Sequence, residues 1–335
     1  MSGRYDFASD NVAPAAPEAL AALGRFNEGF APAYGADPVS ARAADLVRAF
    51  LDADAEVRFV ASGTAANAIA LSAICRSFDA VIAHEHAHIC TDETGAPGLF
   101  GHGVGLIALP GPAGKLSPAA LAGPLAQPPL AHRQAAAALS VTNATEYGTV
   151  YSAEELAALA APLRARGLPV HLDGARLANA VAAGFDPKSL RQVCDIAVFG
   201  GTKAGATPSE AIVIFDPALR GRFDARLKQA GQLPSKARFY AAPFIGLLED
   251  GAILRHAAHA NAMARRLAKA MPFPIRHPVE ANAVFVGMDE PTLARLHAAG
   301  WFVHRFLDGS VRFMCSWATT AEAVDELAQA LKAVA

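Results

Sequence analysis

The sequence predicts an α/β fold in which a mostly parallel, doubly wound sheet is followed by a smaller C-terminal α+β domain. Three observations predict this class. Between residues 57 and 215, short apolar runs alternate with helical patterns, as they do in successive βαβ units. Polar clusters directly follow several of these runs, and parallel sheets carry functional side chains at that edge. After about residue 245 a long helical pattern precedes shorter strands and helices.

The composition limits the function classes. The chain has 335 residues, of which 53% are hydrophobic and 18% are charged, so it can bury a large core. Its 29 Lys and Arg residues against 31 Asp and Glu residues leave no basic surplus, and we expect no nucleic-acid partner. No apolar run approaches the ~18 residues of a membrane span, so we expect no membrane partner.

Cysteine usage and the N-terminus favour a cytoplasmic protein. Cys75, Cys90, Cys194 and Cys315 are far apart and form no CxxC pair, which is typical of free thiols in a reducing compartment. Residues 1–6 lack the apolar segment of a secretory signal. We therefore expect the cytoplasm as the location.

The predicted elements of the large domain begin after an N-terminal arm at residues 1–20, which is rich in Ala and Pro and lacks periodicity. The large domain is expected over residues 21–245, with a first helix opened by Pro38. Ser152 and Glu155 form a capping-box pattern that predicts a helix to Arg166. A further helix is predicted from residue 65 to 77. The predicted strands are 57–60, 80–83, 105–109, 138–141, 169–172, 196–199 and 211–215.

The small C-terminal domain is expected over residues 246–335. The apolar spacing of residues 249–271 predicts one long helix. The other predicted elements are strands at 282–287, 301–306 and 311–315, and helices at 291–299 and from 320 onward.

Lys203 is the first candidate site residue. It follows the buried-looking strand 195–199, Asp-Ile-Ala-Val-Phe, in a Gly-Gly-Thr-Lys turn. Apolar surroundings lower the pKa of a lysine amine and make it available as a nucleophile. From its position alone, Lys203 also fits a solvated lysine in a surface loop.

Asp173 is the second candidate, at the end of the apolar run 170–172. A carboxylate at the end of a central strand is costly unless it is paired. Its partner could be the protonated ring nitrogen of a cofactor, or Asp173 could simply cap the helix that follows.

Two further segments suit a ligand. Ser62-Gly63-Thr64 joins a strand to a helix start, where backbone N–H groups suit a phosphate, although an ordinary capped helix has the same pattern. Residues 84–88 hold three alternating histidines, for which we expect no metal because residues two apart share no helix face. An imidazole stacked on a cofactor ring is the functional alternative to a solvated histidine. A lysine for an imine, an acid for a ring nitrogen, a phosphate-binding segment and a histidine that stacks on a ring together fit pyridoxal phosphate.

The same residues lie in segments that resemble a known family, in the family's order. The segments are Ala8–Asn11, Tyr34–Pro38, Ser62–Asn67, His86–Ile89, His171–Leu177, Gly201–Lys203 and Ser310–Phe313. In them the chain resembles the low-specificity L-threonine aldolases, and the phenylserine aldolase branch most closely. These are pyridoxal-phosphate enzymes of fold type I, the aspartate-aminotransferase-like class.

The resemblance implies roles for single residues. Lys203 would hold the cofactor covalently, Asp173 would pair with its ring nitrogen, and His88 would stack on the ring and serve as the leading candidate base. The remaining expected contacts are Gly63, Thr64 and Thr202 to the phosphate, Lys236 to a neighbouring subunit's phosphate, Arg176 to cofactor and substrate, and Ser9 and Arg312 to the substrate carboxylate. Residues 142–146 depart from the family's Glu-Asn-Thr-His pattern.

The expected activity is cleavage of L-threonine, L-allo-threonine or a related β-hydroxy-α-amino acid, L-phenylserine included, to glycine and an aldehyde. The small-molecule amino acid is the expected substrate. The resemblance also implies a homodimer or homotetramer with the site at the subunit interface. The alternatives are a β-eliminating amino-acid lyase or racemase on the same scaffold, and a non-catalytic ligand-binding regulator.

Overall fold

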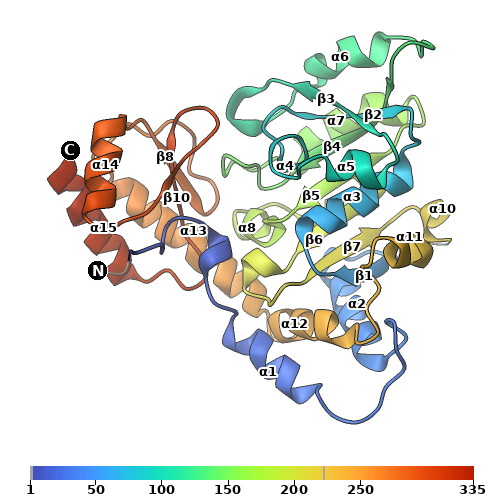
Figure 1. Cartoon of the computed structure of the whole chain (residues 1–335), viewed down its shortest axis with the longest axis horizontal. Helices are drawn as coiled ribbons and strands as arrows, with labels where there is room; N and C mark the ends of the chain where they lie inside the picture. The colour runs from blue at the N-terminus through green and yellow to red at the C-terminus, as the bar shows by residue number, and fades with distance from the viewer. Residues whose placement is uncertain (1–2, 222) are drawn as a thin grey trace.

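The structure is a computed structural model that describes residues 3–221 and 223–335 (Figure 1). Its main body is a seven-stranded sheet with the strand order β1-β7-β6-β5-β4-β2-β3. The strands are β1 (Glu56–Val60), β2 (Asp79–His84), β3 (Gly105–Leu109), β4 (Ala135–Thr142), β5 (Val170–Gly174), β6 (Ile196–Gly200) and β7 (Glu210–Ile214). β7 runs antiparallel to both β1 and β6, and the other neighbours are parallel. The mostly parallel sheet predicted from the sequence is therefore present.

Helices cover both faces of this sheet because successive side chains of its strands point to opposite faces. The helices of the main body are α1 (Pro17–Arg25), α2 (Pro38–Leu51), α3 (Gly63–Ile74), α4 (His88–Thr91), α5 (Ala96–Phe100), α6 (Pro118–Ala126), α7 (Ala153–Arg164), α8 (Leu177–Ala182), α9 (Leu190–Val193), α10 (Pro217–Arg220), α11 (Phe223–Gln229) and α12 (Arg238–Leu248). In β6, Ala197 and Phe199 pack in a core with α2, α7 and α12, whereas Ile196 and Val198 pack in another core with α3 and α11.

Capping residues set the starts of two helices that position the site. The Ser62 hydroxyl accepts a hydrogen bond from the Ala65 N–H at the start of α3. Ser152 and Glu155 form the predicted capping box of α7.

The long helix predicted over residues 249–271 is present as α13 (Ala252–Ala270). It begins three residues later than predicted, because Gly251 separates it from α12, which ends at Leu248. Gly251 has a φ of +65°, a left-handed conformation that lies between the two helices and that glycine adopts readily. The predicted boundary at residue 245 lies inside α12, and the domain limits stay predictions.

The C-terminal part forms a three-stranded antiparallel sheet in the order β8-β10-β9. Its elements are β8 (Ala283–Val286), α14 (Glu290–Ala298), β9 (His304–Arg305), β10 (Val311–Met314) and α15 (Ala321–Val334). In Figure 1 this sheet lies beside the main body with both chain ends, and α13 runs between the two parts. Helix α13 contacts α8 on one side and α15 on the other.

The predicted strand 301–306 is present only in part, because β9 covers residues 304 and 305 alone. The backbone of residues 300–302 forms hydrogen bonds with the N-terminal arm. The Phe302 N–H donates to the Arg4 carbonyl at 2.9 Å, and the Arg4 N–H donates to the Gly300 carbonyl at 2.8 Å. Phe7 then inserts fully buried into the C-terminal core. The arm therefore packs on the C-terminal part before a short 3-10 helix, η1 (Asp10–Val12), leads into α1.

No helix within the described ranges, 3–221 and 223–335, is long and apolar enough to cross a membrane.

Candidate active site

Two adjoining cavities lie at the edge of the main sheet where β1, β4, β5 and β6 end and β7 begins. The first has a volume of about 230 Å³, and the second, of about 320 Å³, also borders the C-terminal part. The two share five lining residues: Asn11, His88, Glu146, Arg176 and Lys203. Both cavities therefore belong to one cleft.

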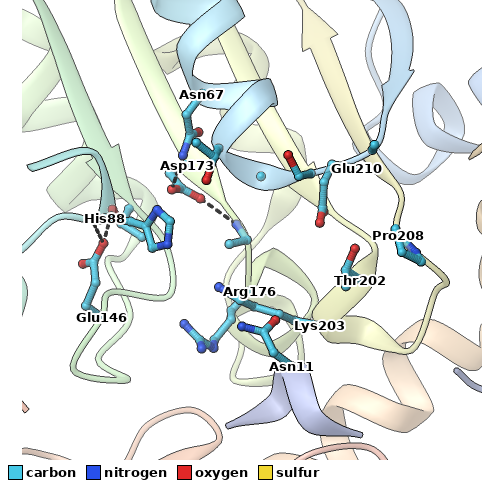
Figure 2. Close-up of a pocket in the computed structure, with 16 residues that line it drawn as sticks. Asn11, Asn67, His88, Glu146, Asp173, Arg176, Thr202, Lys203, Pro208 and Glu210 are labelled. Carbon is cyan, nitrogen blue, oxygen red and sulfur yellow. Dashed lines mark hydrogen bonds between the residues drawn. The ribbon is translucent and has the colours of Figure 1, made fainter. Parts of the chain in front are cut away.

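Lys203 lies in the centre of this cleft, in a 3-10 turn, η4 (Thr202–Ala204), directly after β6 (Figure 2). Burial lowers the pKa of its amine, and the nearby Arg176 guanidinium lowers it further. The carboxylates of Asp10, Asp173 and Glu210 oppose this shift without cancelling it. The amine is thus in the setting that favours a nucleophilic lysine.

Asp173 is buried near the end of β5, and its carboxylate lines the first cavity. Its Oδ1 accepts the Ala175 N–H at 2.9 Å, and its Oδ2 accepts the Asn67 amide at 2.8 Å. Burial alone would raise the pKa of Asp173, but Lys203 and these two donors hold it below its usual value. The following helix, α8, has Arg176 at its N-cap position, so Asp173 does not serve as that cap.

His88 belongs to a hydrogen-bonded chain that ends at Asp173. The His88 Nδ1 lies 2.8 Å from the Glu93 Oε1, and the Asn67 amide donates to that same oxygen as well as to Asp173. The contact with Glu93 raises the pKa of His88, and burial raises the pKa of Glu93. Figure 2 shows the His88 ring turned into the cavity. Glu93 therefore orients the ring and leaves Nε2 to face a ligand.

Glu146 holds the backbone next to this ring. Its Oε1 accepts the His88 N–H at 2.9 Å and the Thr142 hydroxyl at 3.0 Å. Its Oε2 is buried and has no partner among the described residues. Burial and the charge of Asp173 raise the pKa of Glu146.

The opposite end of the first cavity holds Gly63 and Thr64 from the start of α3 and Thr202 from η4. The first N–H groups of a helix lack partners within the helix, and its dipole favours an anion there. The structure brings these three predicted phosphate contacts together.

The two arginines predicted to bind a carboxylate stand in different surroundings. Arg176 donates from Nε and Nη2 to the two oxygens of Asp10, at 2.7 and 2.9 Å. Arg312, on β10, reaches only the Ala8 carbonyl at 3.4 Å, and its Nε is buried without a partner in the described ranges. Burial lowers the pKa of Arg312, and Arg176 adds to that shift.

Of the other predicted contacts, Ser9 lines the second cavity together with Arg312. Its hydroxyl accepts the Asn11 N–H at 3.2 Å at the start of η1. Lys236 is exposed between α11 and α12 and lines neither cavity of this chain. Its predicted contact with a neighbouring subunit stays a prediction.

Sequence reasoning assigned no role to several lining or supporting residues, namely Asp10, Asn67, Glu93, Glu146 and Glu210. A signal existed for two of them. Asn67 interrupts an otherwise small and apolar helix, and Glu210 opens an apolar strand, so each places a polar group where burial is costly.

Comparison with known proteins shows the family of the chain. Residues 6–291 match the model of a family described as beta-eliminating lyase. The chain belongs to the beta-eliminating lyase family. It is similar to a protein called low specificity L-threonine aldolase from Pseudomonas sp. (strain NCIMB 10558), with 46% identity over 98% of this chain and 97% of the relative. The resemblance stated from the sequence is thereby confirmed.

Solved structures confirm the predicted fold class. A threonine aldolase from Leishmania major has a TM-score of 0.92 and 31% identity, covering 99% of this chain and all of its own. An aspartate aminotransferase from Thermus thermophilus has a TM-score of 0.71 at 16% identity, covering 97% of this chain and 89% of its own, which concerns the fold alone.

The residues present fit the cofactor that this family membership supports, pyridoxal phosphate. The amine, the ring acid, the histidine and the helix N-terminus expected for it line one cavity. The chemistry of these groups supports the fit: the lowered pKa of Asp173 keeps its carboxyl group ionised near Lys203, and both residues line the first cavity.

Proposed function

We propose that this chain is a pyridoxal-phosphate-dependent carbon–carbon lyase that cleaves L-threonine and related β-hydroxy-α-amino acids to glycine and an aldehyde. The observation that carries the proposal is the placement of Lys203 beside a firmly held Asp173 in one cavity, in a chain 46% identical to a low specificity L-threonine aldolase.

The cofactor would be held by residues of the main sheet edge. Bound pyridoxal phosphate accepts the electron pair that is released at Cα when a bond there breaks. Lys203 would hold it covalently, and Asp173 would keep the ring nitrogen protonated, because an ionised carboxylate favours the charged ring. Gly63, Thr64 and Thr202 would bind its phosphate at the other end.

The substrate would be oriented from the second cavity. Arg312 presents guanidinium donors that the described residues leave largely unpaired, and such a planar fork suits a carboxylate. Ser9 and Arg176 line the same cavity.

His88 would take the proton from the substrate β-hydroxyl as the Cα–Cβ bond breaks. Its Nδ1 is engaged by Glu93, which leaves Nε2 as the proton acceptor. Glu93 would then stabilise the imidazolium that forms, as a buried carboxylate does when it orients a catalytic histidine.

The family's own description favours one alternative, β-elimination, because it names that reaction. The two reactions give different products from one substrate. L-Threonine, L-allo-threonine and L-phenylserine would each be supplied to the holoenzyme, and aldehyde, glycine, ammonia and racemised substrate would be assayed separately. Aldehyde with stoichiometric glycine supports the lyase proposed here, whereas ammonia with a 2-oxo acid contradicts it.

Borohydride reduction followed by peptide mapping tests the cofactor site independently of turnover. The pyridoxyl group is expected on Lys203. A label on Lys236 or Lys115 instead would overturn the assignment of the cavity. Lys115 is a suitable internal control, because it pairs with Glu155 on the surface of α7.

The proposal also includes a homodimer or homotetramer, in which Lys236 reaches the phosphate bound to the neighbouring subunit, and a cytoplasmic location. Sedimentation velocity of the holoenzyme, with Lys236→Ala compared for cofactor affinity, tests the first of them.

A further inference from the structure

A buried carboxyl group, that of Glu210, lies at the end of the cleft where the cofactor phosphate is expected. Glu210 opens β7, opposite Val60 of β1 and Gly200 of β6, and is 7% exposed. Its Oε2 accepts the Gly201 N–H at 2.8 Å. Figure 2 shows its carboxyl group directed toward Thr202, inside the cavity that Gly63 and Thr64 also line.

An ionised carboxylate conflicts with a phosphate at this place. A phosphate monoester carries nearly two negative charges at neutral pH, and a second anion in a poorly solvated cavity repels it. Among the described residues that line this cavity, the lysine and arginine side chains are those of Arg176 and Lys203. Arg176 is already paired with Asp10, and Lys203 is the amine that would join the cofactor ring.

The ionisable groups around Glu210 do not remove the conflict. Lys203 from η4 and Asp173 from β5 act on it with opposite signs. Helix α3 carries no ionisable side chain, and those of β1, Glu56 and Arg58, stand opposite Ile214 and Ile212, away from Glu210.

We propose that Glu210 binds the cofactor phosphate as a neutral carboxylic acid, donating its proton in a hydrogen bond to a phosphate oxygen while its other oxygen keeps the Gly201 N–H. The inference rests on the proposed function, because that function places a phosphate in this cavity. The proton comes from solvent, so the bound state contains one proton more than the free chain and free cofactor do above neutral pH.

The electrostatics of the free chain agree with this. Burial raises the pKa of Glu210 to about 7, although Thr202, the Gly201 N–H and Lys203 each lower it. A phosphate next to the carboxyl raises that pKa further, because it penalises the ionised form. Buried carboxyl groups kept neutral in this way serve as hydrogen-bond donors in other active sites.

A purely structural role for Glu210 predicts a different behaviour. If Glu210 only braces Gly201, a neutral glutamine that keeps this bond changes nothing in the pH dependence of ligand binding. If Glu210 donates a proton to the phosphate, Glu210→Gln keeps a donor in place through its amide but removes the proton uptake. The number of protons taken up on ligand binding therefore distinguishes the two roles.

The experiment measures proton uptake when pyridoxine 5′-phosphate binds to the full chain freed of its cofactor. This probe lacks the aldehyde, so the covalent step at Lys203 does not contribute. Calorimetry in two buffers of different ionisation enthalpy gives the protons bound, in the wild type and in Glu210→Gln. Because ring and phosphate are the same in both proteins, the difference isolates residue 210.

We expect the wild type to take up about one proton more than Glu210→Gln near pH 8.5, and about the same number near pH 5.5, where Glu210 is already protonated. Wild-type affinity should correspondingly fall by up to about tenfold per pH unit relative to the variant above neutral pH. Glu146→Gln serves as the matched control, since it also removes a buried carboxyl group but at the far end of the cleft; it should keep the extra uptake.

Equal proton uptake in the wild type and Glu210→Gln at both pH values overturns the inference and leaves the proposed function intact. Failure of the wild type to bind pyridoxine 5′-phosphate overturns the cofactor assignment and this inference with it. Should Glu210→Gln not fold, infrared difference spectra of the wild type replace it. Binding at high pH must then produce the C=O band of a protonated carboxyl group, and its absence contradicts the inference.

Discussion

The two sides of the cleft differ in how completely their charged side chains are paired. On the main-sheet side, Asp173 has two hydrogen-bond donors, and Arg176 makes two bonds to Asp10. On the C-terminal side, Arg312 donates one long hydrogen bond, to a backbone carbonyl, within the part of the chain that the structure describes, and its guanidinium lies over the Phe306 ring. Charges that are already paired are held in place before any ligand arrives, whereas an unpaired guanidinium is completed by an incoming anion.

This difference assigns the two sides to two ligands. The main-sheet side is preorganised, which suits a cofactor that stays bound through many turnovers. The C-terminal side is incomplete, which suits a substrate carboxylate that enters and leaves. Substitutions on the two sides should therefore affect different quantities.

The largest effect is expected for Asp10→Asn, which tests the pairing on the main-sheet side. Asparagine leaves the Arg176 guanidinium buried without an opposing charge, and breaking a buried pair in this way costs about 3 kcal/mol or more. We expect the free energy of unfolding in urea at neutral pH to fall by about that amount. A loss below about 1 kcal/mol would mean that Arg176 finds other partners and that this side is not held by the pair.

The same pair predicts a pH dependence of stability. Burial alone would raise the pKa of Asp10, but Arg176 holds it at about 2, below the ordinary value of 3.8. A carboxyl group whose pKa is lowered on folding stabilises the fold above its unfolded pKa and loses this contribution as the pH falls through its folded pKa. The difference in unfolding free energy between the wild type and Asp10→Asn should therefore shrink between pH 3.8 and about 2.

The central members of the site could be predicted because of how parallel strands end. Lys203, Asp173 and the segment 62–64 each follow an apolar run, and parallel strands bring such positions to one edge of the sheet. The direction of β7 could not be predicted, because a buried strand has the same apolar pattern whichever way it runs.

The partners of these residues could not be predicted for a physical reason. Asp10 and Arg176 are separated by 166 positions in the chain, and their contact depends on how the arm packs against the C-terminal part. Asn67 and Glu93 meet only after α3 and α4 are packed together. Local periodicity has no information on such long-range contacts. The sequence therefore indicated the residues that carry the chemistry, but not the partners that position them.

Asp173→Asn should have the next largest effect, on turnover rather than on folding. A neutral amide does not favour a protonated ring nitrogen, and removing one such preorganised electrostatic contact costs about a hundredfold in rate. The measurement is kcat for L-threonine with the visible spectrum and the unfolding midpoint recorded alongside. Near-normal turnover in a folded, cofactor-loaded variant would contradict the role of Asp173 at the ring nitrogen.

Arg312→Lys tests the C-terminal side, where the comparison predicts an effect on substrate affinity. Lysine keeps the charge but loses the planar fork that binds both carboxylate oxygens, and we expect KM to rise about tenfold with a smaller change in kcat. The cofactor spectrum should not change. Arg176→Lys is the matched control and should raise KM less, because two of the Arg176 donors already belong to Asp10. An equal rise in both variants would remove the proposed division between the two sides.

Glu93→Gln should shift the acid limb of the pH profile of kcat/KM. The hydrogen bond to Glu93 raises the pKa of His88, and burial works against it. Without the carboxylate the pKa of His88 falls, so the neutral, proton-accepting form persists to lower pH. The acid limb should therefore move to lower pH by about one unit or less. An unmoved limb would show that a group other than His88 titrates in this reaction.

The smallest effect is expected for Asp325→Asn, which has the same bidentate geometry as Asp10 in a different setting. Arg266 of α13 donates from Nε and Nη2 to Asp325 of α15 at 2.9 and 2.6 Å, closely matching the Arg176–Asp10 pair. Both side chains are about half exposed, so water replaces the lost contact and salt screens it. We expect the urea midpoint and the kinetics of Asp325→Asn to equal those of the wild type within error. A loss comparable to that of Asp10→Asn would show that pairing geometry, rather than burial, determines what these ion pairs contribute, and the contrast drawn between paired and unpaired sides of the cleft would then need a different physical basis.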